Sequence, residues 1–400
     1  MPELPDGIAA PESGELPPWA LVDLANRDLG LYVHVPFCRV RCGYCDFNTY
    51  TPTELGGRLS QDAYLEALEA EAALAAGVLG KQRPSVATVF VGGGTPTLLG
   101  ADRLARLLTI VRSHFPFDLG AEITVESNPD SVTEADLTGL ARAGVTRISF
   151  GVQSTVTHVL AALDRTHDPE RVAPLVAAAR RAGLQVSLDL IYGAPGETDA
   201  DWEQSLRDCI ELAPDHVSAY ALVVEPGTRL AAQVRRGVVR TPSDDVLADR
   251  YEFADECLTA AGYDWYEISN WSRSADSRCR HNLGYWNGQN WWGLGPGAHS
   301  HVGGVRWWNV KHPAEYVARA AVGHSPAAAR EELAPDQQRM EKAMLRTRLA
   351  EPWSVAPPTL IELSAAGLVE SMGESGSVRL TRRGRLLADT VARALMDSEG

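Results

Sequence analysis

Short apolar runs alternate with longer amphipathic stretches from Leu31 to about residue 227. Runs of about four to eight apolar residues predict buried strands, and apolar residues spaced three and four apart predict helices. Strands are expected at residues 31–37, 87–94, 121–129, 147–154, 185–196 and 216–227. Helices are expected between them at residues 62–77, 101–115, 134–145, 170–184 and 201–212. This repeated strand-then-helix order predicts a parallel sheet.

The strand sequences also indicate how the sheet closes. Near-continuous apolar runs such as TVFV and LDLIY are typical of strands that are buried on both faces. Because crossovers between parallel strands are right-handed, six such units curl into an open barrel. We therefore expect the α/β fold class, with a partial (β/α)6 TIM-like barrel. Its reactive residues should lie at the C-terminal ends of the strands.

The pattern changes after about residue 240. A single helix is predicted at residues 241–262, and the next segment, Tyr263 to Trp308, holds seven of the ten tryptophans. The tail predicts three helices and a short strand, an order typical of a small winged-helix-like C-terminal domain. We expect four parts: a flexible N-terminal lead-in at 1–30, a core barrel at 31–240, an aromatic-rich extension at 241–325 and the winged-helix-like domain at 326–400.

Charge and composition narrow the class of protein. The 400 residues include 37 Lys and Arg against 52 Asp and Glu, a formal net charge of −15. This charge argues against nucleic-acid binding, because the phosphate backbone selects basic surfaces. The first 20 residues do not resemble a secretory signal, and no stretch approaches the roughly 20 apolar residues needed to span a bilayer. We expect a cytoplasmic protein without a membrane span; peripheral membrane association and oligomeric state stay open.

Three of the six cysteines lie within eight residues, directly after the first predicted strand. They are Cys38, Cys42 and Cys45, spaced C-x3-C-x2-C in HVPFCRVRCGYCDFN. Zinc usually takes four ligands, commonly from two C-x2-C pairs, and the chain has no second pair. A 4Fe-4S cluster held by three thiolates keeps one iron open for another ligand. The alternatives are three buried cysteines without a metal, or a zinc site that a distant histidine completes.

This cysteine spacing resembles the motif of the radical SAM superfamily, in which the amino acid part of S-adenosyl-L-methionine (SAM) binds the open iron. The resemblance implies a 4Fe-4S cluster and SAM as cofactors. Further motifs, YVHVPFC, GGGTPT, GVQS, DLIYGAPGET and YALVVEPGT, are similar to those of the oxygen-independent coproporphyrinogen III oxidase-like family. That family contains the oxidase and a group of heme chaperones. The match covers about residues 31–310 and is weaker in the tail.

The ends of the predicted strands carry residues that match the SAM contacts of that family. Glycines allow a close approach of the backbone to a ligand, although a glycine-rich strand end or a single carboxylate is more often only a turn or a solvated charge. The resemblance implies SAM contacts at Tyr32, Tyr44, Gly93, Gly94, Thr95, Glu126, Gln153, Arg165 and Asp189. Val223 and His299 fall near two further contacts, and the oxidase has another side chain at the position of His299.

Two departures separate this chain from the oxidase. In the oxidase a fourth cysteine stands two residues after the third. This chain has Phe47 at that position. The oxidase also has a long N-terminal region that helps to cover the porphyrinogen. Here only 30 residues precede the first predicted strand, which is too few for such a cover. Both departures favour the heme chaperones over the oxidase.

The segment from His281 to Trp286 reads HNLGYW and resembles the H-N-x-x-Y-W signature proposed to bind heme in the chaperones. Imidazole is a good iron ligand, and aromatic side chains pack on a porphyrin face. His281 is therefore the expected ligand of the heme iron, and Cys279 is a weaker candidate. The alternative is a packed aromatic lid around a hydrogen-bonded histidine.

The resemblance implies a heme chaperone that binds the cluster, SAM and heme, and transfers heme to an acceptor protein such as a respiratory enzyme. Two alternatives are the oxygen-independent coproporphyrinogen III oxidase, which decarboxylates propionates with a radical derived from SAM, and another radical SAM enzyme such as a methyltransferase. No catalytic residue is assigned. The arginines Arg382, Arg383 and Arg385 near the C-terminus are interpreted as a solvated face rather than a DNA site.

Overall fold

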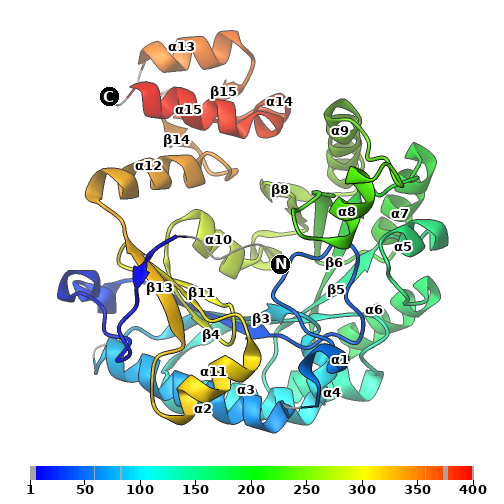
Figure 1. Ribbon diagram of the computed structural model, residues 1–400. Coiled ribbons are helices and arrows are strands. Elements are labelled where there is room, and N and C mark those ends of the chain that lie inside the picture. Colours follow the sequence, from blue (N-terminus) through cyan, green and yellow to red (C-terminus); the bar gives the residue numbers. More distant parts are fainter. Residues whose placement is uncertain (1–5, 58, 82, 356, 373–376, 399–400) are drawn as a thin grey trace.

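Six parallel strands, with helices between them, form the central part of the molecule (Figure 1). The computed structural model describes residues 6–57, 59–81, 83–355, 357–372 and 377–398. The strands lie side by side in chain order. They are β2 (Leu29–Val35), β3 (Val86–Gly93), β4 (Phe117–Ser127), β5 (Arg147–Gln153), β6 (Gln185–Tyr192) and β7 (His216–Ala221). The predicted open barrel of six strand-then-helix units is confirmed.

Helices cover the outer face of these strands (Figure 1). They are α2 (Gln61–Leu79), α3 (Gly100–His114), α4 (Glu134–Arg142), α6 (Val172–Arg181) and α7 (Asp199–Glu211), with the short α1 (Pro52–Leu55), α5 (Thr157–Ala162) and α8 (Arg229–Arg235) in the loops. Several begin at a capping box. The hydroxyl of Thr133 accepts the backbone N–H of Asp136, whose carboxylate accepts the N–H of Thr133. Such reciprocal bonds satisfy free donors and fix where the helix starts.

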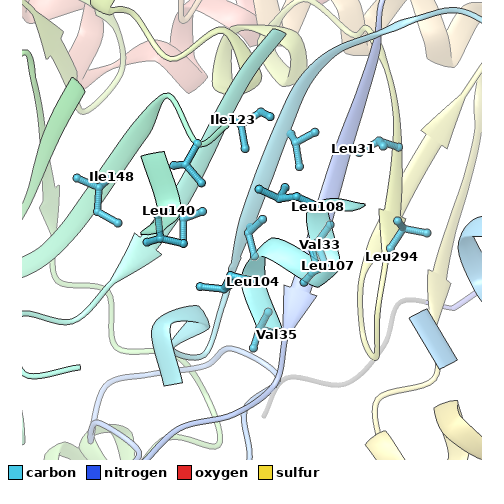
Figure 2. Packing of buried hydrophobic residues seen from close by; sticks show 14 of the residues in the cluster. Leu31, Val33, Val35, Leu104, Leu107, Leu108, Ile123, Leu140, Ile148 and Leu294 are labelled. Atoms are coloured by element: carbon cyan, nitrogen blue, oxygen red, sulfur yellow. The ribbon is translucent and has the colours of Figure 1, made fainter. Parts of the chain in front are cut away.

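Alternation along the strands gives the barrel two different faces. Outward residues such as Leu31, Val33 and Ile123 are almost fully buried against the helices. Figure 2 shows part of this packing, in which Leu107 and Leu108 of α3 appear next to Val33 of β2. The inward positions are buried or half-buried and largely polar, among them Thr124, Arg147, Ser149, Ser187, Asp189, His216 and Ser218. The strands are therefore buried on both faces, as expected, but the inner face is built for polar contacts.

The outer layer makes a direct prediction for stability. Leu108 of α3 is 1% exposed and belongs to the hydrophobic core shown in Figure 2. Leu108→Ala is expected to lower the free energy of unfolding by about 2–5 kcal/mol, because it removes buried methyl groups and leaves a cavity. Urea denaturation followed by circular dichroism would measure this loss. Leu119→Ala, at a fully exposed position on β4, is the control and should change the free energy by less than about 0.5 kcal/mol. Equal effects would contradict the assigned core.

Further strands extend the sheet on both sides of the barrel. Beyond β2 lie β10 (Asn290–Leu294), which is parallel to β2, and then the antiparallel β11 (His299–Val302), β12 (Val305–Asn309) and β13 (Ala327–Glu332). Beyond β7 lie β9 (Asn270–Ser272) and β8 (Asp264–Glu267), after α9 (Asp244–Ala260). The aromatic segment thus supplies strands on both sides of the six barrel strands, and α11 (Pro313–Ala321) packs on α2.

The lead-in that we expected to be flexible packs along the sheet from residue 6 onward. Its first strand, β1 (Ile8–Ala9), pairs with β13. Two short 3-10 helices follow, Pro18–Leu21 and Leu24–Asn26. Ala20 and Leu24 are 1% and 5% exposed. The acidic, Pro- and Gly-rich composition of this segment predicts no packing for these few apolar residues. They are buried only by contacts in the tertiary structure.

The C-terminal elements form a second sheet with a hydrophobic cluster of its own. The elements are α12 (Pro335–Arg346), β14 (Trp353–Ser354), α13 (Pro357–Ala365), β15 (Val369–Ser371), β16 (Ser377–Leu380), α14 (Arg382–Leu386) and α15 (Ala388–Ser398). The strand order is β14-β16-β15. The cluster includes Trp353, Leu363, Val378 and Val391. Because β13 belongs to the large sheet, the second sheet and its cluster begin after Glu332 and not at the expected residue 326. The winged-helix-like assignment stays a prediction.

Arginines hold this C-terminal unit against the barrel side. Arg382 and Arg385 each contact the Asp255 carboxylate of α9 at 2.8 Å. The Arg385 guanidinium also lies 3.9 Å from the ring centre of Trp265. The interpretation of these two arginines as a solvated face is therefore wrong, because they pair with a buried carboxylate. In the part of the chain that the structure describes, no helix is long and apolar enough to cross a membrane.

Candidate functional site

Two adjoining cavities occupy the barrel. The smaller has a volume of about 120 Å³, and all three clustered cysteines line it. The larger has a volume of about 540 Å³ and is lined by the inward residues of the strands and by α10 (Arg280–Trp286). Tyr44, Gly93, Glu126, Gln153 and Asp189 line both cavities, which therefore border each other. The family resemblance implied SAM contacts at all five of these residues.

The loop after β2 carries the three cysteines. The backbone N–H of Cys38 donates to the carbonyl of Tyr50 at 3.0 Å, and that of Cys45 to the carbonyl of Cys42 at 3.2 Å. The thiol of Cys38 lies 3.9 Å from the Thr95 hydroxyl. Burial raises the pKa of the Cys45 thiol to about 12 and also raises that of Cys38. These thiols are therefore protonated without a metal, and metal binding would release their protons.

The residues present fit an iron-sulfur cluster better than a single metal ion. Among the described residues, no three His, Cys, Asp or Glu side chains lie close enough together to hold one ion. A zinc site completed by a distant histidine requires such a group. In a 4Fe-4S cluster each thiolate binds an iron of its own, so the three sulfurs surround a cavity instead of one point. The thiols of Cys38, Cys42 and Cys45 around the smaller cavity match that requirement.

The glycine-rich end of β3 packs closely on the cysteine loop. A Cβ atom at Gly94 would lie 2.5 Å from the carbonyl oxygen of Phe37, and one at Gly93 would lie 2.6 Å from the His34 ring. The N–H groups of Gly94 and Thr95 donate to carbonyls of Val35 and Phe37, both at 2.8 Å. Glycine is therefore required here by the approach of the loop. These two N–H groups donate to the end of β2 and to the cysteine loop. They therefore join the segment after β3 to both.

Two carboxylates face each other across the barrel. Glu126 accepts the N–H of Gly93 at 3.1 Å, and burial together with the negative charge of Asp189 raises its pKa to about 8. Asp189 accepts the Ser149 hydroxyl at 2.9 Å and the Ser187 hydroxyl at 3.4 Å, and burial raises its pKa to about 6. A ligand that brings hydroxyl groups or a positive charge would stabilise both ionised forms.

The pKa of Asp189 predicts how stability depends on pH. Its folded value of about 6 lies above the ordinary 3.8, so the stability that this group contributes is present below about pH 4 and is lost as the pH rises through 6. Asp189→Asn, which cannot ionise, should raise the free energy of unfolding of the ligand-free protein at pH 8 by on the order of 1–2 kcal/mol. Urea unfolding at about pH 4, near the ordinary pKa, should show a much smaller difference; equal differences at both pH values would contradict the assigned pKa.

Arg165 links the cysteine loop to the strand ends. Its guanidinium lies 3.6 Å from the Cys42 sulfur, donates to the Asn128 side chain at 2.9 Å and also contacts the carbonyl of Gly151. Asn128 in turn donates to the Thr95 hydroxyl at 3.2 Å. Sequence reasoning missed Asn128, although it directly follows the polar end of β4. Gln153 has a φ of 65°, a left-handed conformation that is uncommon outside glycine and is found at functional sites.

His281 lies at the other end of the larger cavity, on α10. It is 3% exposed, and its ring stacks on Phe90 with ring centres 5.4 Å apart. Nδ1 lies 2.8 Å from the Thr88 hydroxyl and Nε2 lies 2.9 Å from the Tyr285 hydroxyl. Burial lowers the pKa of His281 to about 3, so the ring is neutral near pH 7. The structure thus shows the hydrogen-bonded histidine that the sequence left open as an alternative. Iron binding at Nε2 requires the Tyr285 hydroxyl to move away from this nitrogen.

The remaining predicted residues divide between the cavities and the outside. Tyr32 lines the larger cavity and shares a 3.0 Å hydrogen bond with His34. Val223 is 60% exposed at the rim of the larger cavity. His299 lines neither cavity: it is exposed on β11, with its ring centre 6.0 Å from that of Trp308. The structure does not bring His299 to the other residues, because β11 lies two strands beyond β2 and outside the barrel.

The barrel and its cysteine loop are those of a radical SAM domain, and the model of the radical SAM superfamily matches residues 32–209. The chain is 50% identical over 389 residues to the heme chaperone HemW of Mycobacterium tuberculosis, covering 96% of this chain and 98% of that one. It is 34% identical over 381 residues to HemW of Bacillus subtilis, covering 91% and 98%. The chain belongs to the HemW family.

A solved structure supports the fold. Coproporphyrinogen III oxidase (HemN) from Escherichia coli, described as a radical SAM enzyme, matches with a TM-score of 0.80. The two are 25% identical, and the match covers 95% of this chain and 92% of that chain. The resemblance stated from the sequence motifs is therefore confirmed, as is the barrel.

Proposed function

We propose that the protein is a heme chaperone. It binds a 4Fe-4S cluster through Cys38, Cys42 and Cys45, SAM at the iron that no cysteine holds, and heme beside His281, and it passes heme to an acceptor protein. The observation that carries this proposal is the arrangement of the two cavities, because the cysteine-lined cavity borders a larger one that extends to the H-N-x-x-Y-W helix. The relatives of nearly equal length named heme chaperone HemW support it.

The chain's own residues have defined tasks in this proposal. When bound, the cluster offers SAM one open iron and exchanges single electrons. Glu126 and Asp189 provide carboxylates for the hydroxyl groups and positive charge of SAM. Arg165 holds the cysteine loop against the strand ends. The Tyr285 hydroxyl keeps its hydrogen bond to Nε2 of His281 until heme binds.

Two observations favour the chaperone over the oxidase. Phe47 is 56% exposed and lines both cavities at the position where the oxidase has a fourth cysteine. No described residue before Tyr32 lines either cavity. From residue 8 the lead-in instead pairs with β13, at the edge of the large sheet. We also propose, from the family resemblance, that the chaperone works in the cytoplasm and that its acceptor is a heme-requiring respiratory enzyme.

One preparation tests the proposal against the oxidase. The cluster is reconstituted anaerobically, and heme binding and coproporphyrinogen decarboxylation are measured on the same sample. We expect about one heme bound per chain and no decarboxylation above a control without SAM. Robust formation of protoporphyrinogen, or the absence of heme binding, would overturn the chaperone assignment.

A further inference from the structure

One buried ion pair holds the segment that leads into α10. Glu122 of β4 and Arg147 of β5 are 7% and 1% exposed, and their charged groups are 3.1 Å apart. The Glu122 carboxylate accepts the backbone N–H of Arg280 at 3.0 Å and that of His281 at 3.1 Å. It also lies 3.7 Å from the Cys279 thiol. The carboxylate therefore satisfies the first backbone donors of the helix.

Arg147 fixes the residues immediately before the helix. Its guanidinium donates to the carbonyls of Ser277 at 2.8 Å and of Arg278 at 3.1 Å, and to the Gln185 side chain at 2.9 Å. Together the two charged side chains contact every residue from 277 to 281. The ion pair thus joins the inside of the barrel to the one segment that carries the heme motif.

The helix depends on this support. It has only seven residues, and its N-cap residue, Cys279, makes no capping hydrogen bond of its own. So short a helix is unstable alone, and its free N–H groups need acceptors. A carboxylate at this end satisfies two of them and interacts favourably with the helix dipole. Glu122 supplies from β4 the cap that the local sequence lacks.

The motif residues contact both the cavity and the frame around it. His281, Asn282 and Tyr285 line the larger cavity, with the Nδ1 atom of His281 fixed by Thr88. The polar groups of Asn282 and Trp286 face the carboxylate of Glu267, which is 1% exposed on β8. Trp286 lies on the opposite end of the helix from Glu122. The helix is therefore held at both ends by buried carboxylates of the large sheet, Glu122 of β4 and Glu267 of β8.

We propose that Glu122, paired with Arg147, is a positioning residue for heme binding. It holds the first turn of α10 so that the His281 imidazole stands in the wall of the larger cavity, with Nε2 directed at Tyr285 and the heme site. This inference rests on the proposed function, since it assigns Glu122 a task in heme binding. Neutralising Glu122 weakens the cap and leaves the Arg147 charge without its partner.

The test compares Glu122→Gln with a matched buried carboxylate. Glu197→Gln is the control, because Glu197 is fully buried, pairs with Arg250 at 2.7 Å and lines neither cavity. In the full-length, cluster-reconstituted protein, Glu122→Gln should weaken heme binding at least about tenfold, as loss of a group that orients a metal ligand usually does. It should also change the heme absorption spectrum. The control should bind heme within about twofold of the wild type.

Hydrogen exchange gives a readout that does not need heme. The amides of Arg280 and His281 should exchange at least about tenfold faster in Glu122→Gln than in the wild type or in Glu197→Gln. In the His281→Ala background, Glu122→Gln should cause no further loss of heme affinity, because the two residues act through one ligand. Heme binding and spectrum like the wild type, a full additional loss in the double variant, or unchanged amide exchange would each overturn the inference.

Two further outcomes are decisive. If the wild type binds no heme, the proposed function fails, and the exchange experiment still decides whether Glu122 positions α10. If Glu122→Gln does not fold, Arg147→Lys takes its place, since it keeps the positive charge but loses the fork that reaches Ser277 and Arg278. Heme binding and exchange in Arg147→Lys equal to those of the wild type would overturn the inference.

Discussion

Replacement of any one of Cys38, Cys42 and Cys45 by alanine is expected to abolish the 4Fe-4S cluster and, with it, SAM binding. Each thiolate would hold an iron of its own, and among the described residues no fourth cysteine lines the smaller cavity to replace a lost one. Iron and sulfide content and the cluster absorbance after anaerobic reconstitution measure the effect. We expect loss of most of the bound iron in each single variant.

A buried cysteine elsewhere provides the control for this experiment. Cys209 of α7 is 2% exposed and lines neither cavity. Cys209→Ala should therefore retain the full cluster, although it removes a buried side chain. A cluster that persists in all three loop variants would refute the shared premise of the chaperone and of both alternatives. Loss in the control as well would show that the assay reports folding instead of ligation.

His281→Ala and Tyr285→Phe are expected to change heme affinity in opposite directions. His281→Ala removes the proposed iron ligand and should weaken binding at least about a hundredfold, or about 2.7 kcal/mol. Tyr285→Phe removes the hydroxyl that occupies Nε2 at 2.9 Å. Such a hydrogen bond contributes about 1 kcal/mol, so this variant should bind heme about fivefold more tightly. Heme titration followed by absorbance measures both.

Another buried histidine serves as the matched control. His301 of β11 is 9% exposed, is hydrogen-bonded through Nδ1 to the carbonyl of Gln289, and lines neither cavity. His301→Ala should leave heme affinity within about twofold of the wild type. Heme binding that is unchanged in His281→Ala would refute the ligand assignment alone, and weaker binding in Tyr285→Phe would show that the hydroxyl contacts heme instead of competing with it.

Local sequence was sufficient for much of the fold. The strands of the barrel follow short apolar runs and its helices follow a period of 3.6 residues, and the chain shows both between residues 31 and 227. It was not sufficient for the ends of the chain. The apolar residues around Ala20 pack only because β13 and its neighbours present a surface to them. The strand β13 pairs with β12 in the large sheet and therefore does not belong to the C-terminal unit. Neither contact leaves a local pattern.

The candidate site divides in the same way. Cysteine spacing and the family resemblance of the strand ends predicted many residues of the smaller cavity, although not Asn128, because neighbouring parallel strands end at one edge of the sheet. The sequence could not predict the hydrogen-bond partners of His281, because Thr88 and Glu122 are 193 and 159 positions away from it along the chain. The SAM contact at His299 stays a prediction from the family resemblance, and the strand order places this residue on β11, two strands beyond β2.

The sequence by itself thus determined the barrel and the cysteine loop, because apolar runs, the helix period and the spacing of thiols are properties of neighbouring residues. Tertiary structure alone decided which polar groups meet inside the barrel. It joined Glu122, Arg147 and the start of α10, and it set His281 between Thr88 and Tyr285. The physical reason is that buried polar groups must find partners, and the closing of the barrel supplies those partners from distant strands.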